Sequence, residues 1–273
     1  MNFKGRVIVT GASGFIGSSL CKHLKSKNIE CLGVSRLASE YTDIKVKSYT
    51  ETLKYNDNNT ILINLAGGNT SILENEIELV IELSNCYKNN MLFFSSAKVY
   101  GEKFKHLVDE GEIISSDNDY TRKKISLEKI ILDNEGMVAR LSNVYGKGMS
   151  ENNVFYDIHK QVIAKKDKIM IQNLKPIRDF IYISDVCEYI YQILILGLKN
   201  LILNLGTGQG TDVKTLFKLI CKSINIDYGK LNISSKNSIE SKLVLNIELY
   251  KKLYGGNPLI SIEQGIYNWL NEK

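Results

Sequence analysis

The chain has 273 residues, a formal net charge of +5 and 44% hydrophobic residues. This length suits one large α/β domain or a domain with a small appendage, and the apolar content is enough for a sizeable core. The mild, dispersed charge does not indicate nucleic-acid binding. We expect no membrane span, because no apolar run approaches ~18 residues, and no signal peptide. Five cysteines without metal spacing favour a cytoplasmic location, and no metal site is expected.

Short apolar strands alternate with amphipathic helices along the first half of the chain. We expect strands at 6–10, 30–35, 43–49 (the weakest), 60–66, 91–96 and 137–141, and helices at 16–26, 72–87 and 117–132. This alternation predicts an α/β fold of Rossmann type, in which helices cover both faces of a doubly wound parallel sheet. Such sheets bind ligands beyond the carboxyl ends of their strands.

A glycine-rich loop with the spacing G-x-x-G-x-x-G follows the first predicted strand. Gly11 permits a tight turn, Gly14 lets the backbone approach a pyrophosphate, and Gly17 allows the next helix to pack closely on the sheet. The N-terminus of that helix then offers free N–H groups to the anion. A loop without a ligand is the alternative, but this position in a βαβ unit favours dinucleotide binding. The contacts expected here are Gly11, Ser13, Gly14, Phe15, Ile16 and Gly17.

The end of the second predicted strand indicates which dinucleotide binds. NAD-preferring folds place Asp or Glu there, where it accepts a hydrogen bond from the ribose 2′-hydroxyl. This chain has Ser35 and Arg36 instead of a carboxylate. An arginine can hold a 2′-phosphate through charge-assisted hydrogen bonds, and the alternative is a solvated surface arginine. We therefore favour NADP(H), with NAD(H) as the alternative.

Tyr120 and Lys124 lie four residues apart on a predicted helix, and therefore on one face of it. A phenol stays protonated near pH 7 unless a nearby cation stabilises the phenolate. Ser96, at the end of the strand predicted for 91–96, could hydrogen-bond a substrate oxygen. An exposed helix face and a turn-capping serine are the ordinary explanations for such residues. Their position after a dinucleotide loop favours a reaction centre.

These motifs together resemble the extended short-chain dehydrogenase/reductase superfamily, in its NAD(P)-dependent nucleotide-sugar epimerase/dehydratase/reductase branch. Its markers follow in order over nearly the whole chain. They are TGASGFIG from Thr10, Leu65-Ala66-Gly67, SSAKVYG from Ser95, Tyr120-x-x-x-Lys124, RLSNVYG from Arg140, RDFIYISDV from Arg178 and NLGTG from Asn204.

The resemblance implies roles for individual residues. The implied catalytic triad is Ser96, Tyr120 and Lys124, because the position of the following Val-Tyr-Gly selects Ser96 over Ser95. The further implied cofactor contacts are Ser35, Arg36, Leu65, Ala66 and Gly67, together with Tyr120 and Lys124. The implied substrate contacts are Ser96, Ala97, Asn143, Asn153 and Arg178. Arg178 could bind phosphate through bidentate hydrogen bonds from its guanidinium, or it could instead form an ion pair with Asp179 or Asp185.

The resemblance also implies a domain organisation and an oligomer. Residues 1–146 with about 177–206 form the expected dinucleotide-binding domain. About 147–176 and 207–273 form a smaller α/β domain for the nucleotide-sugar substrate. Family members often dimerise through a four-helix bundle, so a homodimer is expected. The chain departs from the family pattern at Asp119, Lys123 and Asn246, where Pro, a small residue and Asp are common, and Lys123 could compete electrostatically with Lys124.

The residues after Ser96 bear on which reaction the family resemblance implies. A 4,6-dehydratase has an Asp-Glu pair there, and a 3,5-epimerising reductase has a cysteine two places on, so Ala97 and Lys98 argue against both. We favour NADPH-dependent reduction of the 4-keto group of a nucleotide-linked 4-keto-6-deoxy sugar, with Tyr120 as proton donor. The alternatives are an NAD-dependent nucleotide-sugar 4-epimerase and a non-catalytic NADP-binding regulator.

Overall fold

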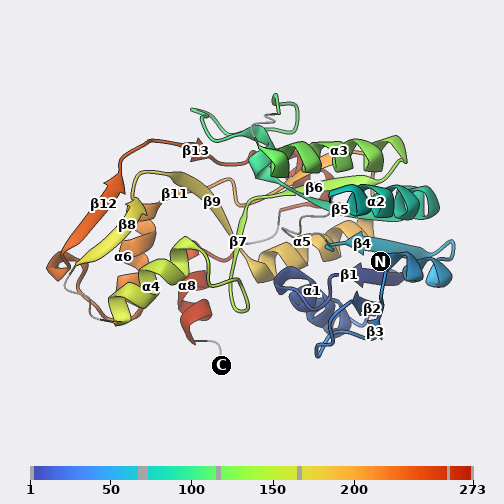
Figure 1. The fold of residues 1–273 in the computed structure, drawn as a ribbon, viewed down its shortest axis with the longest axis horizontal. Coiled ribbons are helices and arrows are strands. Elements are labelled where there is room, and N and C mark those ends of the chain that lie inside the picture. The colour runs from blue at the N-terminus through green and yellow to red at the C-terminus, as the bar shows by residue number, and fades with distance from the viewer. Residues whose placement is uncertain (1–2, 67–72, 115–117, 165–167, 257–258, 272–273) are drawn as a thin grey trace.

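The computed structural model describes residues 3–66, 73–114, 118–164, 168–256 and 259–271. Its largest feature is a parallel sheet of seven strands in the order β10-β6-β5-β4-β1-β2-β3 (Figure 1). The strands are β1 (Arg6–Thr10), β2 (Glu30–Ser35), β3 (Ile44–Lys45), β4 (Thr60–Asn64), β5 (Met91–Ser96), β6 (Met137–Leu141) and β10 (Ile202–Leu205). The predicted Rossmann-type fold is confirmed.

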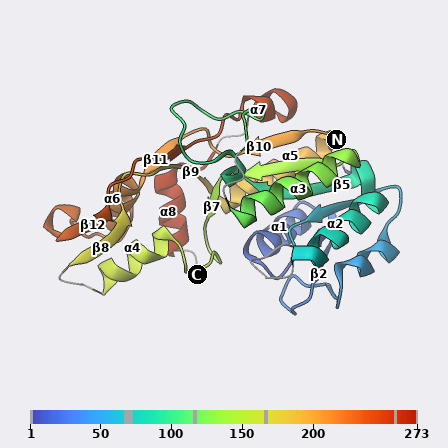
Figure 2. The ribbon, with the colours of Figure 1, turned by 45° about the horizontal axis from the view of Figure 1, so that its top comes forward.

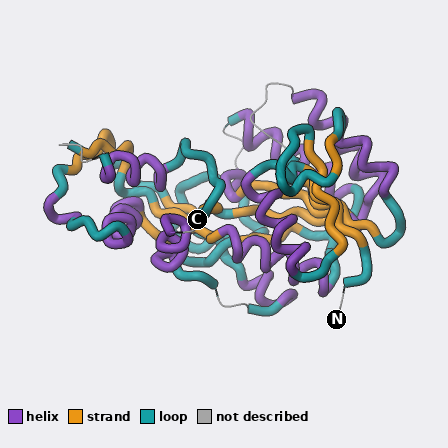
Figure 3. The backbone as a smooth tube through the Cα atoms, turned by 90° about the horizontal axis from the view of Figure 1, so that it is seen from below, coloured by secondary structure: helices purple, strands orange, loops and turns teal. Residues whose placement is uncertain are grey.

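Both faces of the sheet are buried because successive residues of a strand point to opposite faces. Val7 and Val9 of β1 belong to one apolar cluster and Ile8 to the other. Helices α1 (Phe15–Ser26) and α5 (Ile183–Leu196) pack together on the first face, and α2 (Leu73–Tyr87) and α3 (Asp119–Asp133) on the second. Figure 2 labels these four helices around the strands, and Figure 3 shows helices on both sides of the strands.

The strand predicted for 43–49 is wrong over most of its length, because only β3 forms a ladder there. Ser48 and Glu51 make a capping box, in which each side chain hydrogen-bonds the backbone of the other's position. This box starts the 3₁₀ helix η1 (Tyr49–Tyr55), so the backbone N–H groups are satisfied locally rather than by a neighbouring strand. Short 3₁₀ turns also occur at η2 (Lys88–Asn90), η3 (Ala97–Tyr100) and η4 (Tyr228–Lys230).

The remaining strands form two small sheets. In the first, β9 (Ile177–Tyr182) pairs with β7 (Asn143–Tyr145), β11 (Gly210–Asp212) and β13 (Lys242–Leu243), and in the second β8 (Ile169–Asn173) pairs with β12 (Ile233–Asn237). The accompanying helices are α4 (Val154–Ile163), α6 (Val213–Ser223), α7 (Glu248–Tyr254) and α8 (Ile262–Asn271). The domain boundaries expected from the sequence stay a prediction.

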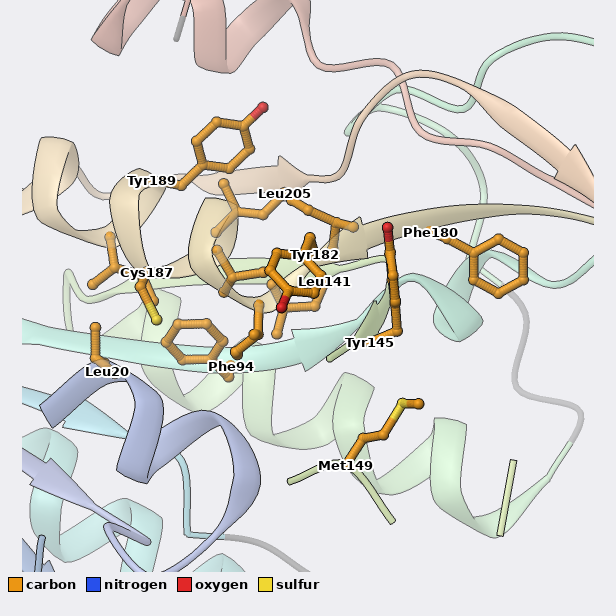
Figure 4. Close-up of a cluster of buried hydrophobic side chains, with 14 of the residues drawn as sticks. Leu20, Phe94, Leu141, Tyr145, Met149, Phe180, Tyr182, Cys187, Tyr189 and Leu205 are labelled. Atoms are coloured by element: carbon orange, nitrogen blue, oxygen red, sulfur yellow. The ribbon is translucent and has the colours of Figure 1, made fainter. Parts of the chain in front are cut away.

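One apolar cluster runs from the large sheet into the small ones, and it includes Phe94, Leu141, Tyr145, Met149 and Phe180 (Figure 4). Within this cluster the Tyr145 ring of β7 stacks on the Phe155 ring of α4, with centroids 4.7 Å apart. In the described part of the chain, helices of the length and apolarity that a membrane crossing requires are absent.

Candidate active site

A cavity of ≈ 480 Å³ lies at the carboxyl ends of β5 and β6, beside the first turns of α1, α3 and α4. Eight of the residues expected from the sequence line it. They are Phe15, Ile16, Leu65, Ser96, Tyr120, Lys124, Asn143 and Asn153. This edge of a parallel sheet is where ligands bind in such folds. The cavity therefore joins the predicted cofactor loop to the predicted reaction centre.

The glycine loop has the backbone geometry of a phosphate cradle. Gly11 has φ +73°, in the left-handed region that favours glycine. A Cβ on Gly17 would lie 2.2 Å from the carbonyl oxygen of Gly11, so no larger residue fits there. Gly14 caps α1 without any side-chain hydrogen bond, which leaves first-turn N–H groups for an anion.

The glycine loop is hydrogen-bonded to the end of β2, where the sequence predicts that the 2′-phosphate of NADP binds. The Ser13 and Ser35 hydroxyls lie 2.6 Å apart, so one donates to the other. Arg36 follows on the exposed surface, with its guanidinium 5.7 Å from the centroid of the Tyr49 ring. Among the described residues Arg36 has no carboxylate partner, so its charge remains available to a phosphate.

Two buried polar atoms near the strand ends also fit a polar ligand. The Asn64 amide accepts from Thr10 Oγ1 at 2.6 Å, but its Nδ2 has no partner among the described residues. The hydroxyl of Ser142, which lines the cavity, is likewise unpaired within the described chain. Native proteins rarely leave such atoms unsatisfied. Together with the glycine cradle, these atoms fit a dinucleotide and its substrate.

Lys124 is held at the cavity by β5. Its Nζ donates to the Phe94 carbonyl at 2.9 Å and lies 4.7 Å from the centroid of the Phe93 ring. Burial lowers the pKa of Lys124 to about 8, the neighbouring Lys123 ammonium lowers it as well, and the Glu128 carboxylate opposes both. This ammonium is therefore poised to lose its proton in a range where an exposed lysine keeps it.

The unusual residues around Tyr120 have local partners. Asn118 caps α3 by accepting from the Thr121 N–H at 3.0 Å, which starts the helix without the missing proline. Asp119 pairs with Arg122, and Lys123 pairs with Glu76 of α2. The Lys123 side chain is thus directed to another helix, although its charge still reaches Lys124.

Tyr120 stands in the first turn of α3 and is 42% exposed. Ser96, at the end of β5, accepts from the Lys98 N–H at 3.3 Å. In the described parts of the structure no hydrogen bond joins the side chains of Ser96, Tyr120 and Lys124. The cavity brings the three together, and their catalytic roles stay a prediction.

Ser95 and Ser96 differ in what their hydroxyls do. The Ser95 hydroxyl donates to Glu128, one turn beyond Lys124 on α3. Glu128 also pairs with Arg140 of β6, with Nη2–Oε2 at 2.6 Å, and both side chains are under 5% exposed. The Arg140 guanidinium lies 4.6 Å from the centroid of the Tyr100 ring. Ser95 is therefore held in a buried network, whereas the Ser96 hydroxyl accepts only the Lys98 N–H among the described residues.

Four predicted contacts are placed differently from the rest. Ala97 is buried in η3 and, although it follows Ser96, it is not among the residues that line the cavity. Asn153 lines the cavity but uses its Oδ1 to cap α4, accepting from the Phe155 N–H at 2.9 Å. Arg178 is outside the lining and pairs with Glu102 at 2.5 Å rather than with Asp179 or Asp185. Gly67 lies outside the described residues.

The sequence did not reveal the apolar part of the wall. The lining residues that it missed are Phe94, Leu141, Ser142, Val144, Met149, Val154, Phe155 and Phe180, with Ser95 beside them. Some lie within the quoted motifs, as Leu141, Ser142 and Val144 do in RLSNVYG, but their contact with the cavity depends on the packing of α4 and β9. Glu128 does not line the cavity, but its position four residues after Lys124 on the same helix could have predicted that its carboxylate influences that lysine.

Comparisons with known proteins agree with this geometry. Residues 7–206 match the model of the NAD dependent epimerase/dehydratase family. The chain is 32% identical over 241 residues to GDP-6-deoxy-D-talose 4-dehydrogenase of Aggregatibacter actinomycetemcomitans, covering 80% of this chain and 79% of that one. It is 24% identical over 273 residues to UDP-glucose 4-epimerase of Bacillus subtilis, covering 78% and 80%.

A solved structure of similar shape is dTDP-glucose 4,6-dehydratase of Bacillus anthracis in complex with NAD. It matches with a TM-score of 0.84 and 17% identity over 98% of this chain and 97% of that one. At this identity the similarity shows the fold alone.

Proposed function

This chain belongs to the NAD dependent epimerase/dehydratase family, and on that premise we propose that it reduces the 4-keto group of a nucleotide-linked 4-keto-6-deoxy sugar with NADPH. The observation that carries the proposal is the chemistry of the cavity wall. Among its described residues, Tyr120 and Lys124 are the only ionisable side chains. One proton-transfer couple suits a ketone reduction, whereas elimination of water needs a further acid and base.

In the proposed reaction Tyr120 gives its proton to the oxygen of the 4-keto group, and the carbonyl becomes a secondary alcohol. Ser96 donates a hydrogen bond to that oxygen and fixes its direction. The Lys124 ammonium stabilises the negative charge left on Tyr120. When bound, NADPH supplies the hydride for the carbon and leaves as NADP⁺. The glycine loop with Ser13, and Arg36 at the end of β2, are the residues proposed to hold it.

The named relatives support the class of substrate. A dehydrogenase that acts at carbon 4 of a GDP-linked 6-deoxy sugar catalyses the reverse of the reduction proposed here. The wall of the cavity also suits a sugar with a methyl group at carbon 6, because Leu141, Met149 and Val154 contribute apolar surface to it. Asn143, which lines the cavity, is the proposed polar contact to the nucleotide part, and Arg178 would join it only by leaving Glu102.

The deciding assay follows NADPH oxidation with a nucleotide-linked 4-keto-6-deoxyhexose and with the parent hexose. We expect turnover with the ketosugar alone. Tyr120→Phe should lower kcat/KM at least a hundredfold while NADPH binding is kept. The matched control Tyr267→Phe, at an exposed position of α8, should leave kcat/KM unchanged. Full activity of Tyr120→Phe would refute the proton-donor role.

The second candidate is a 4-epimerase, which the similarity to UDP-glucose 4-epimerase favours. The same tyrosine and lysine would then move a proton in both directions around a cofactor that is not consumed. Interconversion of 4-hydroxy epimers without added cofactor, and no net NADPH oxidation, would establish this candidate in place of the reductase.

The choice of NADP over NAD rests on Arg36. We expect a higher kcat/KM with NADPH than with NADH, because the guanidinium pairs with the 2′-phosphate. Arg36→Asp should reverse that order, while Lys22→Asp, on the exposed side of α1, makes a similar charge change and should preserve it. Equal use of both cofactors by the unmodified protein would contradict this part of the proposal.

The domain and assembly predictions remain part of the proposal. We take the large sheet with residues 1–146 and about 177–206 as the cofactor domain, and about 147–176 with 207–273 as the substrate domain. A homodimer is proposed from the family pattern, and sedimentation of the purified chain tests it. A cytoplasmic location is likewise proposed, and the five free cysteines support it.

A further inference from the structure

A second cavity, with a volume of ≈ 850 Å³, lies against the other face of the strand that carries Phe180. Successive side chains of a strand point to opposite faces of its sheet, and β9, labelled in Figure 1, is such a strand in the small sheet. Phe180 lines the catalytic cavity, whereas Ile177, three positions earlier, lines the second one. The second cavity is therefore distinct from the proposed active site, and a ligand bound there would take no part in the proposed reaction.

Four neighbouring extended segments place one residue each in a row along this cavity. Ile177 is in register with Asp212 on one side and with Lys242 on the other, and Lys242 is paired with Lys103. Residues paired across a sheet project from the same face. All four of these residues line the cavity. Backbone pairing, rather than chance contact between flexible side chains, therefore sets their positions.

The cavity is rich in lysine. Five of its eleven lining residues are lysines, compared with 30 of 273 in the chain. Of the two carboxylates present, Glu240 pairs with Lys175 at 3.0 Å, and Asp212 caps α6 by accepting from the Thr215 N–H at 2.7 Å. The other four lysines have no carboxylate partner within the described residues. They are Lys103, Lys105, Lys214 and Lys242.

Apolar side chains complete the wall, namely Phe104, Leu174 and Ile177. From this combination we infer that the cavity binds an organic phosphate that carries an aromatic or apolar group. Lysine binds phosphate as a point charge, and a phosphate monoester has close to two negative charges at pH 7. The apolar residues would shelter the organic part. The volume is in the range of about 300–1,000 Å³ for small-molecule sites.

Phenyl phosphate is the probe for this site, with inorganic phosphate and phenol as its two halves. The isotope-labelled full chain is first saturated with NADPH, so that the glycine loop is occupied. It is then titrated with each of the three compounds while its amide chemical shifts are recorded. We expect shifts at Lys103–Lys105 and Lys242, and affinity at least tenfold higher for phenyl phosphate than for either half. Lys103→Gln/Lys105→Gln should weaken binding at least tenfold.

The matched control is Lys251→Gln/Lys252→Gln, which removes two exposed charges from α7 and should leave the affinity within twofold. Thermal unfolding of both variants checks that they are folded. The inference is overturned if the two double variants bind phenyl phosphate equally, if inorganic phosphate alone binds as well, or if the shifts lie around Ser96 instead.

Discussion

Replacing Lys124 by Met should make the protein more stable and nearly inactive. Burial lowers the pKa of Lys124 from 10.5 to about 8, so folding disfavours its charged form by about 3 kcal/mol. Methionine fills similar space without that charge, but the hydrogen bond to the Phe94 carbonyl is lost, at a cost of about 1 kcal/mol. We therefore expect the free energy of unfolding at pH 7 to rise by about 2 kcal/mol, while kcat/KM falls at least a hundredfold.

The pH dependence tests the cause of that gain. A lysine whose pKa is lowered by folding destabilises the native state fully below its folded pKa, and the cost disappears as pH rises from about 8 to 10.5. Denaturant unfolding at pH 7 and pH 10 should show the gain shrinking at the higher pH. Lys129→Met, on the exposed face of α3, should change stability by no more than about 0.5 kcal/mol. A Lys124→Met variant that is less stable, or whose gain is independent of pH, would refute the reasoning.

Glu128→Gln should destabilise the protein by about 3–5 kcal/mol, because it leaves the buried Arg140 charge uncompensated. Glu128→Leu combined with Arg140→Met should cost less than either single change, and additive costs in a double-mutant cycle would contradict this. Asp185→Asn should raise stability by up to about 3 kcal/mol at pH 7, since burial raises the pKa of Asp185 to about 6 and only the Ile260 N–H opposes this. The native carboxyl binds protons more tightly than the unfolded one, so the advantage should disappear as pH falls from about 6 to below 4, and an advantage that persists at pH 3.5 would count against it.

Local signals made the cofactor side of the site predictable. The residues that position the glycine loop are neighbours in sequence, so a strand, three glycines and an apolar helix were enough to place it. The Tyr120–Lys124 spacing likewise follows from the helix itself. The strand predicted for 43–49 failed for an equally local reason, the capping box of Ser48 and Glu51.

Contacts between segments that are far apart in the sequence could not be predicted from such local signals. Arg178 is paired with Glu102, 76 residues earlier, and no spacing rule points to that partner. Glu128 meets Arg140 only because α3 packs over β6, and Phe180 reaches the cavity only because β9 pairs with β7. The apolar wall of the cavity is therefore a property of tertiary packing.

Two different parts of the chain form the wall of the cavity, and each is proposed to have its own role. The groups proposed for proton transfer come from α3 and the proposed orienting hydroxyl of Ser96 from β5, and the buried Ser95–Glu128–Arg140 network joins these two elements to β6. Much of the wall that would shape the sugar pocket comes from Met149, Val154, Phe155 and Phe180. On the proposed function, exchanging the segment from Met149 to Phe155 between relatives should change the sugar specificity while leaving Tyr120 untouched.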